Sequence, residues 1–539
     1  MSVTWESTTS HIKADVIILG CSLPGIVTAH KLKKKFGNTV DIVVLDLTGS
    51  VASGSKCNVT FQEEEGENED FVHKGTAKEL IDNVGRHFIA VYAKEFNIPV
   101  PDAIITPEKG KTALNKLFEY KTGDTVDCKQ DFHDFDYLNI FENFELNQYQ
   151  TLLDQYMREL FQANNIENVS ERHQLMYFDQ TTMEQHICNA LIFANSKDIM
   201  RNIVRVVCGA PASVVSLLFY LHQCYRTSSA RNHLDGNNTK LREKLLGYCR
   251  KRIASKLQKS VANITMPAKP IKKISTYSDE QVILRTFKGD TNYVCSLLAM
   301  AMKPDELRHI EVESQLLYNS EVEITAAMKQ GKAKKFLIQY EDCFWQRYGY
   351  SGDILSVRGP IIWAMERPTM SATGSLEKYA ALIGYLTLKE NDDEDSREAV
   401  IKQLVRLFGA DAASPVSYRE TDIADIYVPR CGDFIGLRRL TRKFQPGYLE
   451  WGALDIFGDG DVAAALEAGH TAYLHLMSCL RPQALTYEEI SAVEWPTILS
   501  EGPLRKWLAQ FTIKSSLRLA AYTAATYVVL RLLRSYIRK

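Results

Sequence analysis

The stretch "ADVIILGCSLPGIVTAH", residues 14–30, decides the fold of the first part of this chain. It begins with a continuous apolar run that ends in a glycine turn, and apolar residues then recur with helical spacing. A second apolar run, "VDIVVLD", ends at Asp46. This order predicts a β-α-β unit of the kind that holds a dinucleotide. In such units the pyrophosphate lies at the helix N-terminus, and an acidic residue about 20 positions further on meets a ribose hydroxyl.

The glycines of this turn depart from the usual G-x-G-x-x-G fingerprint, because the three positions hold Gly20, Ser22 and Gly25. The side chain of Ser22 narrows the approach to a pyrophosphate, although its hydroxyl could donate a hydrogen bond. Pro24 costs little, because its N–H would have no partner in the first helical turn. The turn is also the central packing unit of such a fold, so we expect Gly20 and Gly25 to be needed with or without a ligand. The candidate cofactor-binding residues here are Gly20, Ser22, Gly25 and Asp46.

Composition excludes several classes of protein. A chain of 539 residues is too long for one core, so two or three domains are expected. The formal net charge of -2 gives no reason to expect nucleic-acid binding. The 11 cysteines include no C-x-x-C pair, which argues against a zinc site and a disulfide framework and favours a reducing compartment, and we expect no metal.

Helical and strand patterns alternate along the rest of the chain. This alternation, which begins with a dinucleotide-type β-α-β unit, predicts an α/β or α+β fold with a nucleotide-binding domain. The helical patterns cover residues 182–225, 241–257, 396–409 and 461–477, and the strand patterns cover residues 272–302 and 333–345.

The C-terminal segment has a different composition. An uncharged run from Leu519 to Leu530 is bracketed by Arg518 and Arg531. As a helix this run spans about 18 Å, which is short of the roughly 30 Å hydrocarbon core of a membrane. The leucines that follow add apolar length, and flanking arginines can snorkel to the lipid headgroups. We therefore expect a membrane-anchoring helix at about residues 517–535; an amphipathic helix on a surface is the alternative.

Several further segments carry a family resemblance through their order and spacing. They are "YFDQTTMEQHI" (177–187), "CSLLAMAMKP" (295–304), "KKFLIQYEDCFWQRYGYSG" (334–352), "YVPRC" (427–431) and "AALEAGHTAY" (464–473). Together with the β-α-β unit and the tail, they resemble the flavin-containing monoamine oxidases over nearly the whole chain.

The resemblance implies a fold with a discontinuous Rossmann-like domain that binds FAD. A substrate domain of mixed sheet and helices and a C-terminal membrane-anchoring helix complete it. The expected boundaries are 13–85, 225–300 and 412–478 for the FAD-binding-like domain, 86–224 and 301–411 for the substrate-like domain, and 479–539 for the C-terminal region.

The resemblance also implies a reaction, the oxidative deamination of a small amine with FAD as hydride acceptor and O₂ as final acceptor. Lys335 matches the active-site lysine of the family, which would hold a water near flavin N5. Cys431 matches the cysteine that forms a thioether to the flavin. Taken without the resemblance, Lys335 is an exposed lysine in the lysine-rich run "KQGKAKK" and Cys431 is a small buried hydrophobe, so both alternatives stay open.

The resemblance, together with the basic C-terminal end, implies the cytosolic face of the mitochondrial outer membrane, with the endoplasmic reticulum membrane as the alternative. The membrane is thus the first expected partner and a small amine the second. Protein partners are not indicated, and a homodimer stays open.

The sequence departs from the family where residues serve only the ligand. "SVASGS" (50–55) lacks the arginine of a Gly-Gly-Arg segment, and "LGYCRK" (246–251) replaces a Gly-Gly-x-Gly loop. "LDIFGDGD" (454–461) replaces a Gly-Thr-Glu-Thr segment and brings Asp459 and Asp461 toward the diphosphate, where their charge has the wrong sign. Gly432 stands where a tyrosine of the aromatic substrate cage is expected.

Two functions therefore remain open. One is a flavin-dependent amine oxidase with weakened cofactor binding. The other is a catalytically inactive member, a pseudoenzyme that acts as a binding or scaffold protein on the mitochondrial outer membrane. A more distant resemblance is to the GDP-dissociation inhibitors, which share the FAD fold; the tail and the lysine strand argue against it.

Overall fold

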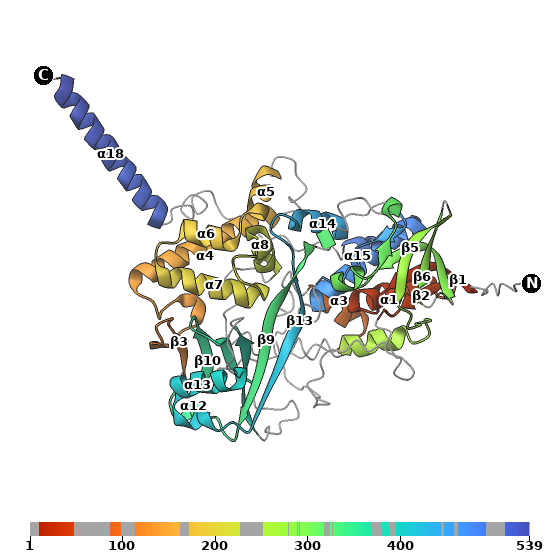
Figure 1. Cartoon of the computed structure of the whole chain (residues 1–539), viewed down its shortest axis with the longest axis horizontal. Helices are drawn as coiled ribbons and strands as arrows, with labels where there is room; N and C mark the ends of the chain where they lie inside the picture. The colour runs from red at the N-terminus through yellow and green to blue at the C-terminus, as the bar shows by residue number, and fades with distance from the viewer. Residues whose placement is uncertain are drawn as a thin grey trace, which may run out of the picture. The chain divides into compact units, whose positions relative to one another are not determined.

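The computed structural model of the chain forms two compact units. The first unit comprises residues 1–106, 241–332 and 423–496, and the second comprises residues 107–240, 333–422 and 497–539. Figure 1 shows the elements of both along the chain. The structure describes residues 10–47, 87–98, 114–161, 172–226, 252–278, 280–287, 289, 291–316, 324–325, 327–367, 379–387, 395–442, 447–456, 462–491 and 513–537.

The sheet of the first unit is built around β1 (Ser10–Leu19). β1 pairs in parallel with β2 (Ile42–Leu45) on one side and with β7 (Thr291–Met300) on the other. The strand order is β2-β1-β7-β6-β5-β8, and β14 pairs in parallel with β7 outside this path. The remaining strands are β5 (Ile271–Ser278), β6 (Gln281–Thr286), β8 (Glu311–Val312) and β14 (Leu449–Glu450).

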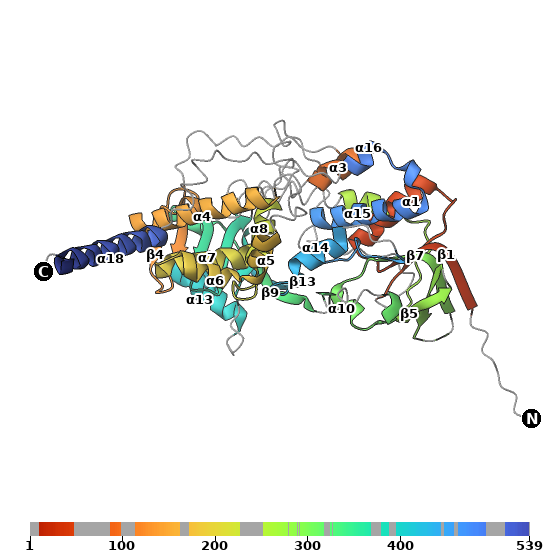
Figure 2. The ribbon, with the colours of Figure 1, turned by 90° about the horizontal axis from the view of Figure 1, so that it is seen from above.

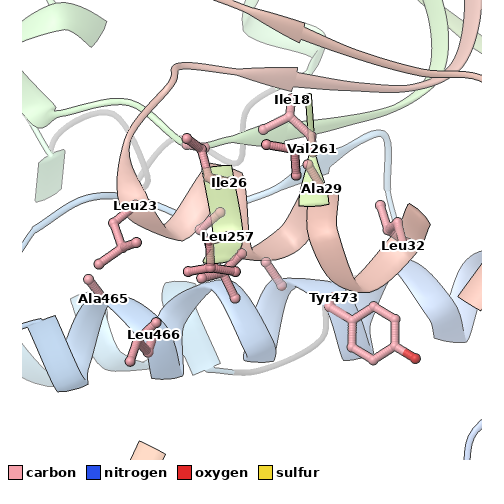
Figure 3. Close-up of a cluster of buried hydrophobic side chains, with 14 of the residues drawn as sticks. Ile18, Leu23, Ile26, Ala29, Leu32, Leu257, Val261, Ala465, Leu466 and Tyr473 are labelled. Carbon is pink, nitrogen blue, oxygen red and sulfur yellow. The ribbon is translucent and has the colours of Figure 1, made fainter. Parts of the chain in front are cut away.

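Helices cover the face of this sheet to which Val16 and Ile18 point, because successive side chains of a strand alternate between the two faces. α1 (Leu23–Phe36) and α15 (Val462–Leu480) form the centre of this layer, and Figure 3 shows their side chains packed against each other and against Leu257. The other helical segments of the unit are α3 (His87–Glu95), residues 252–260, α10 (Pro304–Leu307), η6 (Ser314–Leu316), α14 (Phe434–Arg442), η9 (Pro482–Ala484) and α16 (Tyr487–Ser491).

The second sheet has the order β13-β9-β12-β11-β10-β3-β4. Its strands pair antiparallel at β9–β12, β12–β11, β11–β10 and β3–β4, whereas β10 and β3 are parallel. The strands are β3 (Asn115–Glu119), β4 (Thr125–Cys128), β9 (Lys329–Tyr340), β10 (Tyr350–Ser356), β11 (Ile361–Arg367), β12 (Ala380–Leu386) and β13 (Ser417–Val428).

One face of the second sheet packs on α13 (Ser396–Phe408). Phe336, Ile338 and Leu382 of the strands share a core with Leu404 of this helix. Elsewhere in the unit α4 (Ile140–Phe161) and α7 (Ala194–Cys208) lie side by side (Figure 2). The remaining helices are η2 (Phe132–Asp134), α5 (Arg172–Gln180), α6 (Met183–Ala190), α8 (Leu217–Arg226), α12 (Phe344–Arg347) and η7 (Ala410–Ala413).

The C-terminal segment forms α18 (Ile513–Ile537). Several of its described apolar side chains are exposed, among them Leu519, Tyr522 and Leu530. Among the residues that the structure describes, no helix combines the length and the apolar character needed to cross a membrane. The transmembrane anchor expected at about residues 517–535 is therefore not supported.

Candidate functional site

The turn after β1 is held by the end of β7. Gly20 has a φ of 111°, and its N–H donates to Leu45 O at 2.9 Å. A Cβ on Gly20 would lie 2.1 Å from Ala301 O. Because no side chain fits at that distance and a positive φ strains every residue but glycine, the packing of the two strands alone requires Gly20.

Gly25 and Gly469 allow α1 to approach the sheet and α15. A Cβ on Gly25 would lie 2.8 Å from the Cβ of Ala301, and one on Gly469 would lie 2.5 Å from Pro24 O. The hydroxyl of Thr28 donates to both Pro24 O and Gly469 O, at 2.8 and 3.0 Å. These contacts lie inside the protein, which agrees with the expected packing role of Gly25.

Ser22 occupies the N-cap position of α1, but its side chain does not cap the helix. Its hydroxyl donates to Ala301 O at 2.6 Å instead. The proton of this hydroxyl is therefore used inside the protein, and only the oxygen lone pairs remain to meet a ligand. The donor role toward a pyrophosphate that the sequence allowed is not what the structure shows.

The start of α1 still has the chemistry of an anion site. The first helical bond runs from Ile26 N–H to Ser22 O at 3.0 Å, so the N–H groups of Leu23 and Gly25 have no acceptor within the helix. Pro24 contributes no N–H, and the first turn carries no acidic residue. Two amides at the positive end of a helix dipole can bind a phosphate oxygen.

Asp46 follows β2 directly and is buried. Its main chain is fixed on the side away from β1, since its N–H donates to Pro267 O at 3.1 Å and its carbonyl accepts from Lys269 N–H at 3.0 Å. On the other side, Leu45 O accepts from Gly20 N–H. The structure thus brings Asp46 to the same sheet edge as the glycine turn, as the β-α-β pattern predicts.

Two further carboxylates belong to the segments around β14 and α15, and the sequence reasoning missed both. The Oε1 atom of Glu450 accepts from Gly452 N–H at 2.7 Å and lies 2.8 Å from Nδ1 of His475. Glu467 is buried and pairs with Arg442. An acidic residue within an apolar run such as "YLEWGAL" is the sequence signal that could have found Glu450.

Lys335 lies on β9 in the second unit. The side chains of Phe336 and Ile338 enter the core with α13, so Lys335 points to the opposite face of the sheet, and it is exposed. Its neighbour Lys334 lies on the α13 side and pairs with Glu420 at 3.3 Å.

Cys431 follows β13 in the first unit and is a half-buried thiol outside any disulfide. The next residue, Gly432, has a φ of 101°, at which a tyrosine would be strained. Glycine therefore suits the turn at this position. Of the expected site residues, the structure brings Gly20, Ser22, Gly25 and Asp46 together, whereas Lys335 belongs to the other unit.

Three of the expected departures from the family lie outside the described residues. They are residues 50–55, residues 246–251, and the pair Asp459 and Asp461.

Comparisons with known proteins agree with the resemblance found in the sequence. The model of the flavin containing amine oxidoreductase family matches residues 267–430. A relative from Dictyostelium discoideum, "Probable flavin-containing monoamine oxidase A", is 23% identical over 416 residues, which cover 75% of this chain and 83% of the relative.

Solved structures of amine oxidases share the fold. Wild-type putrescine oxidase bound to putrescine superposes with a TM-score of 0.62 at 15% identity and covers 87% of this chain and 100% of its own. Cyclohexylamine oxidase from Brevibacterium oxydans gives a TM-score of 0.60 at 17% identity and covers 87% of this chain and 99% of its own. The resemblance to the flavin-containing amine oxidases is therefore confirmed in sequence and in fold.

Proposed function

We propose that this chain is a monoamine-oxidase-like flavoprotein that oxidises a small amine. The observation that carries the proposal is the sheet edge of the first unit, where the Gly20 turn, the start of α1 and Asp46 meet. These groups fit the adenosine diphosphate half of FAD, because the helix start suits the diphosphate and a carboxylate suits a ribose hydroxyl.

Each candidate residue has one role in this proposal. The amides of Leu23 and Gly25 bind the diphosphate, and Asp46 accepts from the ribose. Cys431 would lie beside the flavin ring as the thiol available for a thioether, whose formation would pass two electrons to the flavin and release the thiol proton, and the amino group of Lys335 would orient a water. FAD, when bound, would supply the hydride acceptor that no side chain offers, with O₂ as the final electron acceptor.

A catalytically inactive scaffold protein is the second candidate. Two features favour it. The hydroxyl of Ser22 donates to Ala301 O, and Gly432 stands where an aromatic cage residue is expected. Both features reduce what the chain offers to a flavin and an amine, while the packing of the fold is kept.

The flavin content of the purified full-length protein tests the proposal. A flavoprotein absorbs at about 450 nm and is stabilised against heat by added FAD, because a ligand of the folded state shifts the unfolding equilibrium. With flavin bound, an amine substrate should drive O₂ consumption. A colourless protein whose melting temperature does not respond to FAD would leave only the scaffold function.

The proposal includes a role for the C-terminal helix α18, which attaches the protein to the cytosolic face of the mitochondrial outer membrane. This attachment is supported by exposed Val528 and Val529 within an apolar stretch flanked by Arg518 and Arg531. Flotation with liposomes tests it. The double variant Val528→Asp, Val529→Asp should stay unbound, whereas Ser516→Asp, before the stretch, should float like the wild type; equal flotation of all three proteins would refute attachment through this helix.

A further inference from the structure

The register of the second sheet places three chemically distinctive side chains in one row. Lys335 of β9 lies opposite Tyr385 of β12, and Tyr385 lies opposite Trp363 of β11. Directly opposed residues point to the same face of a sheet, and the rings of Trp363 and Tyr385 stack with centroids 5.7 Å apart. This face is the one opposite α13.

α7 covers the same face near this row. The amide of Asn202 donates to Ser356 O at 2.9 Å and to Ile362 O at 3.2 Å, which fixes the helix over the ends of β10 and β11. One turn further, Arg205 donates to the hydroxyl of Thr387 at 3.4 Å. Thr387 follows Tyr385 by two residues, so Arg205 reaches the end of β12 on the side of the aromatic pair.

Arg205 differs from Arg201, which precedes it by one turn on the same helix. Arg201 binds the carboxylates of Glu184 and Asp198 at 2.5 and 2.8 Å. Arg205 is half-buried, and burial lowers the pKa of its guanidinium. In the part of the chain that the structure describes, no carboxylate pairs with it. A partly desolvated guanidinium is stabilised by an anion, and a carboxylate fits its fork in a bidentate manner.

We propose that Arg205 binds the carboxylate of an α-amino acid whose side chain packs on Tyr385, backed by Trp363. This inference rests on the proposed function for the amine chemistry and makes the substrate an amino acid instead of a plain amine. The binding site itself consists of second-unit residues only, so it can be tested with or without FAD.

The test compares two ligands that differ by one group, L-phenylalanine and phenethylamine, which lacks the carboxylate. Their dissociation constants are measured by calorimetry on the full-length protein, as purified and after addition of FAD. We expect L-phenylalanine to bind the wild type at least tenfold more tightly than phenethylamine, a difference of about 1.4 kcal/mol.

The variants separate binding from a structural role. Arg205→Gln should weaken the binding of L-phenylalanine at least tenfold and leave the affinity for phenethylamine within about twofold of the wild type. Arg205→Lys should bind L-phenylalanine with an intermediate affinity, because lysine keeps the charge but not the fork of donors. Arg201→Gln, the matched control on the same helix, should bind both ligands like the wild type. Circular dichroism checks that each variant is folded.

Three results would overturn the inference: no binding of L-phenylalanine to the wild type, equal affinity for the two ligands, or a folded Arg205→Gln or Arg205→Lys variant that binds L-phenylalanine unchanged. The last would mean that Arg205 serves only the C-terminal dipole of α7. The proposed oxidase function can be refuted independently of this site. If the protein binds no FAD but binds L-phenylalanine through Arg205, the oxidase function is refuted and the carboxylate site is kept.

Discussion

Substituting alanine for Gly20 tests whether the turn is kept by packing or by a ligand. The new Cβ would lie 2.1 Å from Ala301 O, so β1 and β7 would have to separate by about an ångström, an overpacking that costs about 1–3 kcal/mol. The φ of 111° adds about 1–3 kcal/mol of backbone strain. We therefore expect Gly20→Ala to destabilise the flavin-free protein by about 2–6 kcal/mol.

The assay is thermal unfolding of the flavin-free wild type and variant. Each kcal/mol lost lowers the melting temperature by about 2–4 °C for a large domain. Gly37→Ala is the control: Gly37 also has a positive φ, of 61°, but nothing lies within 4 Å of its added Cβ. Its ψ of -116° lies outside the left-handed helical region, so Gly37→Ala should cost only the backbone strain of about 1–3 kcal/mol and no overpacking. The reasoning is refuted if Gly20→Ala melts like the wild type and loses only affinity for FAD.

Three further predictions concern single side chains. Ser22→Ala should destabilise the fold by about 1 kcal/mol, because it removes the hydrogen bond to Ala301 O, and should change the affinity for FAD less than twofold. A tenfold loss of FAD affinity in a titration would show instead that the hydroxyl binds the phosphate. Glu489 is opposed in its ionisation by burial, but hydrogen bonds from Tyr473, Thr486 and Lys35 lower its pKa to about 2. Because its pKa is lower in the folded state, ionised Glu489 stabilises the fold above the unfolded pKa of about 4.3, and this stabilisation is lost as the pH falls toward 2. Glu489→Gln should therefore make the melting temperature depend less on pH between about 4.3 and 2; an unchanged pH profile would contradict the assignment. If yellow colour survives acid precipitation of the wild type, Cys431→Ala should release it to the supernatant, and colour retained by the variant would exclude a thioether at this cysteine.

Local patterns predicted the elements that position the site. The apolar run before Gly20 forms β1, the helical spacing after it forms α1, and the second run forms β2 with Asp46 at its end. The helical patterns at 396–409 and 461–477 form α13 and α15. These elements could be predicted because periodicity and turn residues are properties of neighbouring positions.

Contacts between distant segments could not be predicted in this way. The hydroxyl of Ser22 bonds to a carbonyl 279 residues away, and no local pattern shows that its proton is used there. The row of Lys335, Tyr385 and Trp363 depends on the register of three strands. The same sequence with a one-residue slip would send Tyr385 to the other face.

The affinity of the full-length protein for FAD, compared with its affinity for FMN, tests the central claim most directly. FMN carries the isoalloxazine but lacks the adenosine monophosphate portion and the pyrophosphate linkage, which the start of α1 and Asp46 are proposed to hold. The account predicts that FAD binds the flavin-free protein at least a hundredfold more tightly than FMN, a difference of about 2.7 kcal/mol. Equal affinities, or no binding of FAD at all, would contradict it.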